Sequence, residues 1–152
     1  MTRSPASRCA MLDRTQIEDI LPHRDPFLFL DRVIELVPGE YAVAEKDLLA
    51  TEDVFRGHFP GHPVFPGVLQ LEALAQTGAL AVLSQPESRG KIILFGRADE
   101  VKFRRAVYPG ETLRLEMRLT RSRGSVGKGE GKAFVGSEVA CSAVLTFAVA
   151  EP

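Results

Sequence analysis

A histidine in a stiff loop and a carboxylate in an uncharged segment are the two side chains of this sequence best suited to acid–base chemistry. His58 lies in residues 57–67 (GHFPGHPVFPG), and Glu72 follows fourteen residues later as the only charged side chain between residues 64 and 83. Apolar surroundings raise the pKa of a carboxyl group, and a neutral imidazole accepts a proton near pH 7. Such a pair is suited to elimination or hydration.

Removing a proton beside a carbonyl and expelling hydroxide from the next carbon requires a base, a proton source and donors for the enolate-like oxygen. We expect His58 to be the base and Glu72 to hold the departing hydroxyl. The unpaired N–H groups of Gly67 and Val68, at the start of the predicted helix, can bind the oxygen. A lone histidine is more often structural, and a lone helical glutamate is often solvated or satisfied by a neighbour such as Gln76. Their joint arrangement favours catalysis.

Two other patterns resemble known motifs but do not fit them. His58 and His62 have the i,i+4 spacing of metal ligands, yet the prolines and glycines around them oppose a helix, so no metal site is predicted. The glycine-rich stretch 124–131 lacks the Lys-Ser/Thr ending of a phosphate loop. We interpret that stretch as a mobile hairpin connection.

Lys102, Arg104 and Arg105 form a basic cluster in a chain whose net charge is −1. Taken alone, such a cluster is most often the solvated face of a strand. A site that receives an acidic or phosphate-bearing carrier would also need a basic patch.

Composition indicates one soluble domain in this chain of 152 residues. The balanced charge gives no reason to expect a nucleic acid partner or membrane insertion. Two cysteines without ligand or disulfide spacing favour a reducing, cytoplasmic location. We expect residues 1–12 to be a flexible extension and residues 13–152 to be the folded domain.

The order of apolar patterns predicts an α+β fold with an antiparallel β-sheet wrapped around one long central helix. The long helix should begin at Pro66-Gly67 and run to Leu83, apolar on most sides and therefore buried. A short helix with a Thr15/Glu18 capping box should precede the sheet. Two strands are expected at 27–37 and 41–49, and an irregular loop at 52–66 should precede the long helix. After the helix, strands are expected within 91–107, 112–119 and 133–149.

Several motifs of this chain resemble those of one enzyme family. They are 21–28 (LPHRDPFL), 31–33 (DRV), 57–61 (GHFPG), 65–69 (FPGVL), 71–76 (LEALAQ), 101–105 (VKFRR) and 108–111 (YPGE). The chain resembles the bacterial 3-hydroxyacyl-(acyl-carrier-protein) dehydratases of the FabZ type over about residues 15–149. The related dehydratase/isomerases have Asp where this chain has Glu72, so isomerase activity is not expected.

The resemblance implies a hot-dog fold and the dehydration of (3R)-3-hydroxyacyl to trans-2-enoyl groups carried by acyl carrier protein in fatty acid biosynthesis. It implies no cofactor. It also implies a homodimer, often in a trimer of dimers, in which His58 of one subunit faces Glu72 of the other. The residues expected to contact the substrate are Gly67, Val68, Phe59, Pro66 and Gln76.

The basic cluster Lys102, Arg104 and Arg105 would dock the acidic carrier. Two alternatives remain open at this point. One is a hot-dog acyl thioesterase in which Glu72 activates water, and the other is a non-catalytic subunit that binds the carrier protein.

Overall fold

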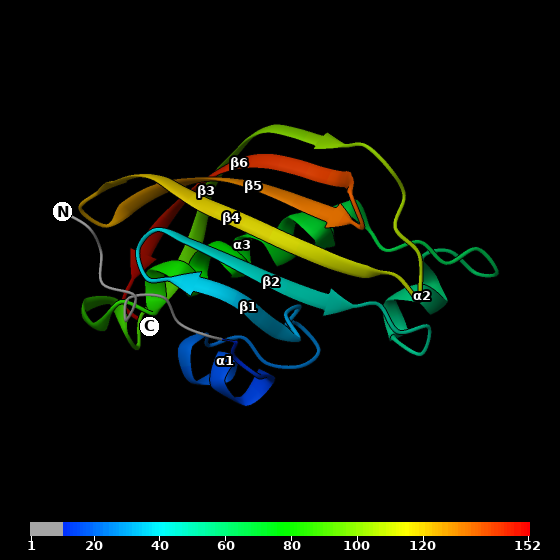
Figure 1. Cartoon of the computed structure of the whole chain (residues 1–152), viewed down its shortest axis with the longest axis horizontal. Helices are drawn as coiled ribbons and strands as arrows, with labels where there is room; N and C mark the ends of the chain where they lie inside the picture. The colour runs from blue at the N-terminus through cyan, green and yellow to red at the C-terminus, as the bar shows by residue number, and fades with distance from the viewer. Residues whose placement is uncertain (1–10) are drawn as a thin grey trace.

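The computed structural model describes residues 11–152 as an antiparallel six-stranded sheet curled around one helix (Figure 1). The strand order is β1-β2-β4-β5-β6-β3, and the central helix is α3. The α+β fold expected from the sequence is confirmed. The elements are α1 (Arg14–Ile20), β1 (Arg32–Val37), β2 (Tyr41–Asp47), α2 (Asp53–Gly57), α3 (Gly67–Leu83), the 3-10 turn η2 (Pro86–Ser88), β3 (Ile92–Phe103), β4 (Thr112–Arg123), β5 (Val126–Val135) and β6 (Glu138–Ala150).

Helix α3 occupies the concave side of the sheet and contacts five of its strands. It starts directly after Pro66, which has no N–H to leave unpaired, and it runs to Leu83 as expected. Ala73, Leu74 and Leu80 are fully buried among its apolar side chains. Each buried leucine contributes about 1.5–3 kcal/mol to folding through the apolar area that it removes from water.

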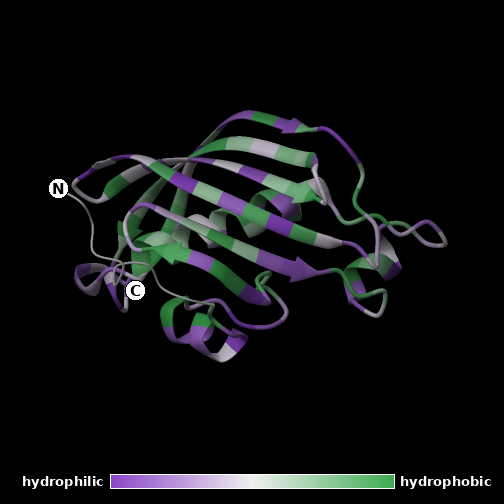
Figure 2. Ribbon diagram, viewed as in Figure 1, coloured by the Kyte–Doolittle hydropathy of each residue, from purple (hydrophilic) through white to green (hydrophobic). Residues whose placement is uncertain are grey.

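The apolar side chains of β4 face helix α3, as the alternating pattern in the sequence predicts. Leu113, Leu115 and Met117 are buried against α3, while the arginines and glutamate between them point outward. Figure 2 shows the same alternation of purple and green along β4. This two-residue period arises because successive side chains of a strand lie on opposite faces.

Three expected boundaries differ from the structure. The capping box of α1 is formed by Asp13 and Gln16, not by Thr15 and Glu18, because Asp13 has extended backbone angles and Thr15 already lies inside the helix. The first strand begins at Arg32, since residues 27–29 hydrogen-bond to a side chain of α3. The loop expected at 52–66 contains the short helix α2.

The interpretation of residues 124–131 as a hairpin connection is wrong for most of that stretch. Only the turn at Gly124 connects strands, and Val126 onward is β5, paired with β4 and β6. Gly127, Gly129 and Gly131 point toward the interior, where an added Cβ would lie within 3.0 Å of a neighbouring side chain. These glycines therefore serve close packing and not chain flexibility.

The expected N-terminal extension lies mostly outside the described residues. Leu12, the second residue that the structure describes, forms two backbone hydrogen bonds with Val33 of β1, at 3.0 and 2.9 Å. Backbone hydrogen bonding to the sheet thus extends to Leu12. The expected start of the folded domain is residue 13.

An ion-pair network at the end of β2 predicts how stability depends on pH. Arg32 donates two hydrogen bonds to Asp47, and Thr112 donates a third, so the pKa of Asp47 falls from its usual value to about 2. A carboxyl whose pKa is lowered by folding stabilises the protein above its unfolded pKa, and the contribution is lost as the pH falls toward the folded pKa.

We expect the free energy of unfolding to decrease between pH 4 and about pH 2, and Asp47→Asn to remove this part of the decrease. The loss at pH 7 should be about 1 kcal/mol or less, because the pair is partly exposed. Urea unfolding at several pH values measures it, with the exposed Asp53→Asn as control. An unchanged pH profile in Asp47→Asn contradicts the prediction.

Candidate active site

One ring nitrogen of His58 forms a hydrogen bond, and none of residues 11–152 bonds to the other. It ends helix α2, and its N–H donates to the carbonyl of Val54 at 3.0 Å. The ring Nδ1 lies 2.7 Å from the carbonyl oxygen of Val64, so Nδ1 carries the proton and donates it. The neutral ring then presents an unprotonated Nε2, which is the form that a general base requires.

The loop after His58 closes on itself through backbone hydrogen bonds. Phe59 and His62 exchange two such bonds, and the N–H of Val64 donates to the carbonyl of His58 at 2.8 Å. The ring of Phe59 stacks on the imidazole with centroids 4.0 Å apart, across a cis peptide bond. Phe59 is half exposed and His62 is exposed.

The first turn of α3 leaves N–H groups without partners beside this loop. Within the described residues, no hydrogen bond is formed by the N–H of Gly67 or Val68, whereas Leu69 and Gln70 donate to the carbonyl of Pro66. A groove of about 450 Å³ lies against both residues. A Cβ on Gly67 would lie 2.8 Å from the ring of Phe103, so a larger residue there requires that ring to move.

Glu72, one turn further along α3, is bound by a buried amide. Gln76 donates one N–H to the Glu72 carboxylate at 3.0 Å and the other to the carbonyl of Phe27 at 2.8 Å. Its oxygen accepts the N–H of Phe29 at 2.8 Å. Gln76 is 1% exposed, so it fixes Glu72 to residues 27–29 from inside the protein. The simpler interpretation from the sequence, that Gln76 satisfies Glu72, is therefore correct for this contact.

His23 lies next to Glu72, a position that the sequence analysis missed. Its Nε2 is 3.8 Å from the Glu72 carboxylate, and both side chains are 23% exposed. Burial lowers the pKa of His23, against the opposing effect of Glu72, so the ring is neutral near pH 7. The two residues are far apart in the sequence, and no spacing rule could have joined them.

A small cavity of about 40 Å³ opens beside Glu72 and continues into apolar surroundings. Glu72, Gln76 and His23 are its polar lining, and side chains of α3, β3, β4 and β6 form the rest. A carboxylate at the mouth of an apolar cavity can act on a polar group whose hydrocarbon continuation lies inside.

His58 and Glu72 do not meet within one chain. No hydrogen bond or ion pair joins them in the described part of the chain, where His58 binds Val64 and Glu72 binds Gln76. Within one chain, His58 and Glu72 therefore belong to separate sets of hydrogen bonds.

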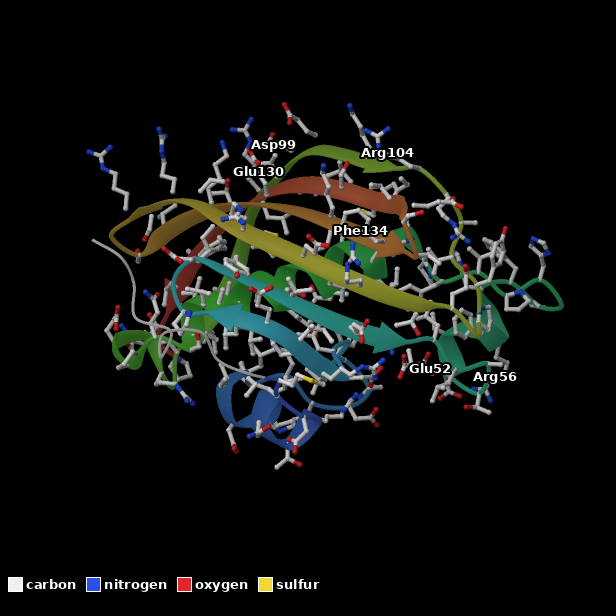
Figure 3. All side chains as sticks on the ribbon, in the orientation of Figure 1. Glu52, Arg56, Asp99, Arg104, Glu130 and Phe134 are labelled. Atoms are coloured by element: carbon white, nitrogen blue, oxygen red, sulfur yellow. The ribbon has the colours of Figure 1, made fainter. Side chains whose placement is uncertain are left out.

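The basic cluster divides into two parts in the structure. Lys102 and Arg104 are exposed near the end of β3, and Arg104 projects outward from the sheet (Figure 3). Arg105 is less exposed and donates two hydrogen bonds to Glu111, at 3.0 and 2.7 Å. Arg104 and Arg105 line the groove beside Gly67, so the Arg104 charge lies near the N–H groups of Gly67 and Val68.

Other chemistries find less support in the described residues. No group of three His, Cys, Asp or Glu side chains between residues 11 and 152 is arranged to hold a metal ion. Burial raises the pKa of the Cys141 thiol to about 11, which disfavours its use as a nucleophile. In the same part of the chain, every helix is too short or too polar to cross a membrane.

The sequence of this chain is similar to one family of known proteins. Residues 21–144 match the family described as FabA-like domain. The chain is 54% identical over 142 residues to the 3-hydroxyacyl-(acyl-carrier-protein) dehydratase FabZ of Chloroflexus aggregans, covering 93% of this chain and 99% of that protein. The chain belongs to the FabZ family. The FabZ protein of Roseiflexus castenholzii is 55% identical, with 91% of this chain and 97% of that protein covered.

Solved structures that are similar to this chain confirm its hot-dog fold. A dehydratase heterocomplex from Xenorhabdus doucetiae superposes with a TM-score of 0.74 at 18% identity, with 90% of each chain covered. An uncharacterized protein from Pyrococcus horikoshii gives a TM-score of 0.64 at 18% identity, covering 88% of this chain and 93% of that one. At these identities the likeness concerns the fold alone.

The Gln76 network gives a prediction for stability and activity together. Gln76→Leu leaves the buried N–H of Phe29 without an acceptor and Glu72 without its donor, which should cost about 1–3 kcal/mol of unfolding free energy and lower kcat. Denaturant unfolding and steady-state kinetics measure the two effects.

Gln70→Leu is the matched control, because Gln70 is equally buried on the same helix but its side-chain oxygen has no partner. That variant should be neutral or slightly stabilising. Equal stability of Gln76→Leu and the wild type would contradict the role given to the amide.

Proposed function

We propose that this chain dehydrates (3R)-3-hydroxyacyl groups on acyl carrier protein to trans-2-enoyl groups, with His58 as the base and Glu72 as the acid. The observation that carries the proposal is the bond of His58 Nδ1 to Val64, since Val64 lines the same groove as Gly67 and Val68, whose N–H groups have no partner among the described residues. A base and two oxyanion donors at adjacent positions suit proton removal next to a thioester carbonyl. The FabZ relatives are named for this reaction.

The reaction balances with these groups alone. Nε2 of His58 takes the proton from the carbon next to the carbonyl, and the electron pair of that C–H bond moves toward the carbonyl oxygen. The N–H groups of Gly67 and Val68 stabilise the negative charge on this oxygen. The pair then forms the carbon–carbon double bond while the C3–O bond breaks, and the hydroxyl leaves as water with a proton from Glu72. Solvent exchange restores both side chains.

The two halves of the site come together if two chains form a homodimer through β3. This strand pairs with β6 on one side, and none of the residues described pairs with its other edge. Leu94, Phe95 and Phe103 of β3 are each about half exposed, which is unusual for apolar side chains of a strand. Pairing of β3 with the β3 of a second copy covers these side chains. A trimer of such dimers stays a prediction.

Lys102 and Arg104 are proposed to dock the acidic carrier. Within residues 11–152, neither forms an ion pair with an acidic neighbour, unlike Arg105, whose charge is paired with Glu111. The position of Arg104 in the groove beside Gly67 suits an acidic protein whose phosphopantetheine arm enters at the start of α3. A cytoplasmic location is part of the same proposal, in keeping with the free and buried Cys141.

Mixing two inactive variants tests the composite site. His58→Ala and Glu72→Gln should each abolish enoyl formation, because one removes the base and the other the acid. After the two are unfolded, mixed in equal amounts and refolded, mixed dimers contain one intact site, so about a quarter of the wild-type activity should return. Enoyl absorbance follows the reaction.

Other outcomes of these assays contradict the proposal or identify a different function. Activity below one per cent after mixing, with mixed dimers verified by a tag on each variant, contradicts a site shared between chains. Full activity in either single variant contradicts the assigned roles. Release of free thiol without enoyl absorbance identifies a thioesterase, and carrier binding without turnover identifies a non-catalytic subunit.

Carrier docking is tested by reversing charge. The double variant Lys102→Glu/Arg104→Glu should raise KM for the carrier-bound substrate by roughly tenfold at low salt, with less effect at high salt. Its kcat/KM for the same acyl group on pantetheine alone should equal the wild type. The matched control is Arg121→Glu, a charge reversal on the outer face of β4. An equal loss with both substrates contradicts docking.

A further inference from the structure

Large apolar side chains of the sheet line the cavity beside Glu72. Met117 of β4 and Phe147 of β6 are among them, together with small side chains of α3 such as Ala75 and Ala79. Hollows of about 550 and 650 Å³ on the outer face of the sheet are lined by many charged residues, whereas this cavity is mainly apolar. Its chemistry suits the hydrocarbon part of a substrate whose polar end reaches Glu72.

Met117 lies in a slot between glycines of two different elements. A Cβ on Gly131 of β5 would be 2.5 Å from the Met117 sulfur, and one on Gly129 would be 2.9 Å from its terminal methyl. On the other side, a Cβ on Gly78 of α3 would be 3.0 Å from its Cγ. The side chain therefore occupies space that any larger residue at these positions would fill.

Phe147 has a similar relation to Gly127. A Cβ there would be 2.5 Å from two atoms of the Phe147 ring, which lies against the bare backbone of β5. Gly127, Gly129 and Gly131 thus hold both side chains back toward the sheet. In their absence, the ring and the thioether would have to move, and the cavity that they line is the adjacent free space.

We propose that Met117 and Phe147 set the longest acyl chain that the site accepts, and that the inward glycines of β5 hold them clear of its path. This inference rests on the proposed dehydratase function. The cavity of about 40 Å³ has room for only a few water-sized groups, since ~10–15 Å³ suffices for one, so as it stands it admits only the first carbons of a chain.

Longer chains require the lining of the cavity to move, and methionine is suited to this. Its side chain is unbranched with three rotatable bonds, so it repacks at lower cost than a branched residue. Met117 already lies in the slot between Gly78 and Gly131, so a longer chain requires its thioether to rotate within that slot. The position of Phe147 next to it then determines how far the chain continues.

The test compares kcat/KM for 3-hydroxyacyl carrier proteins with short, medium and long saturated chains. Gly131→Ala and Gly127→Ala should lower the ratio of long-chain to short-chain kcat/KM by about tenfold, because they push Met117 or Phe147 into the cavity. Met117→Ala should raise the ratio by a similar factor. Lys128→Ala is the matched control, since Lys128 lies between two of the glycines on the opposite face of β5.

The double variant Gly131→Ala/Met117→Ala separates selectivity from damage to the fold. It removes the side chain that the new methyl group displaces, so long-chain activity should return to at least the wild-type ratio. A parallel loss at every chain length in Gly131→Ala, without rescue in the double variant, overturns the inference. Absence of dehydration by the wild type at every length instead overturns the proposed function itself.

Discussion

The burial of an uncharged helix inside a curled sheet is the constraint on which the rest of this protein depends. Helix α3 contacts five strands, so its side chains must be apolar or small, and any polar group on it needs a partner within the protein. Gln76 meets this requirement through three hydrogen bonds, two of them to the backbone of residues 27–29. The same bonds that satisfy the buried amide also orient Glu72. Stability and the placement of a reactive group therefore rest on one set of contacts.

Much of this arrangement could be predicted from the sequence because it depends on local patterns. The start of α3 at Pro66-Gly67, its end at Leu83 and the alternation in β4 are confirmed. The family motifs led to the dehydratase assignment, which the FabZ relatives support. The roles of His58 and Glu72, and the carrier-docking role of the basic cluster, stay predictions.

What the sequence analysis missed depends on contacts between distant segments. His23 lies beside Glu72 only because the chain between residues 21 and 30 crosses α3. The glycines of β5 have low strand propensity, and only the nearby Met117 and Phe147 explain why no larger side chain fits. The pairing of Arg105 with Glu111 likewise depends on the fold of the connection between β3 and β4. A pattern of residue types carries no information about such neighbours.

The hydrogen bond from Nδ1 of His58 to the carbonyl of Val64 leaves Nε2 as the ring nitrogen that can exchange protons. A carbonyl oxygen accepts a hydrogen bond but does not exchange protons, so the imidazole cannot pass a proton from one nitrogen through to the other. In the proposed reaction, every proton that reaches Nε2 must therefore leave from Nε2. The same geometry serves the addition of water as well as its removal, as microscopic reversibility requires.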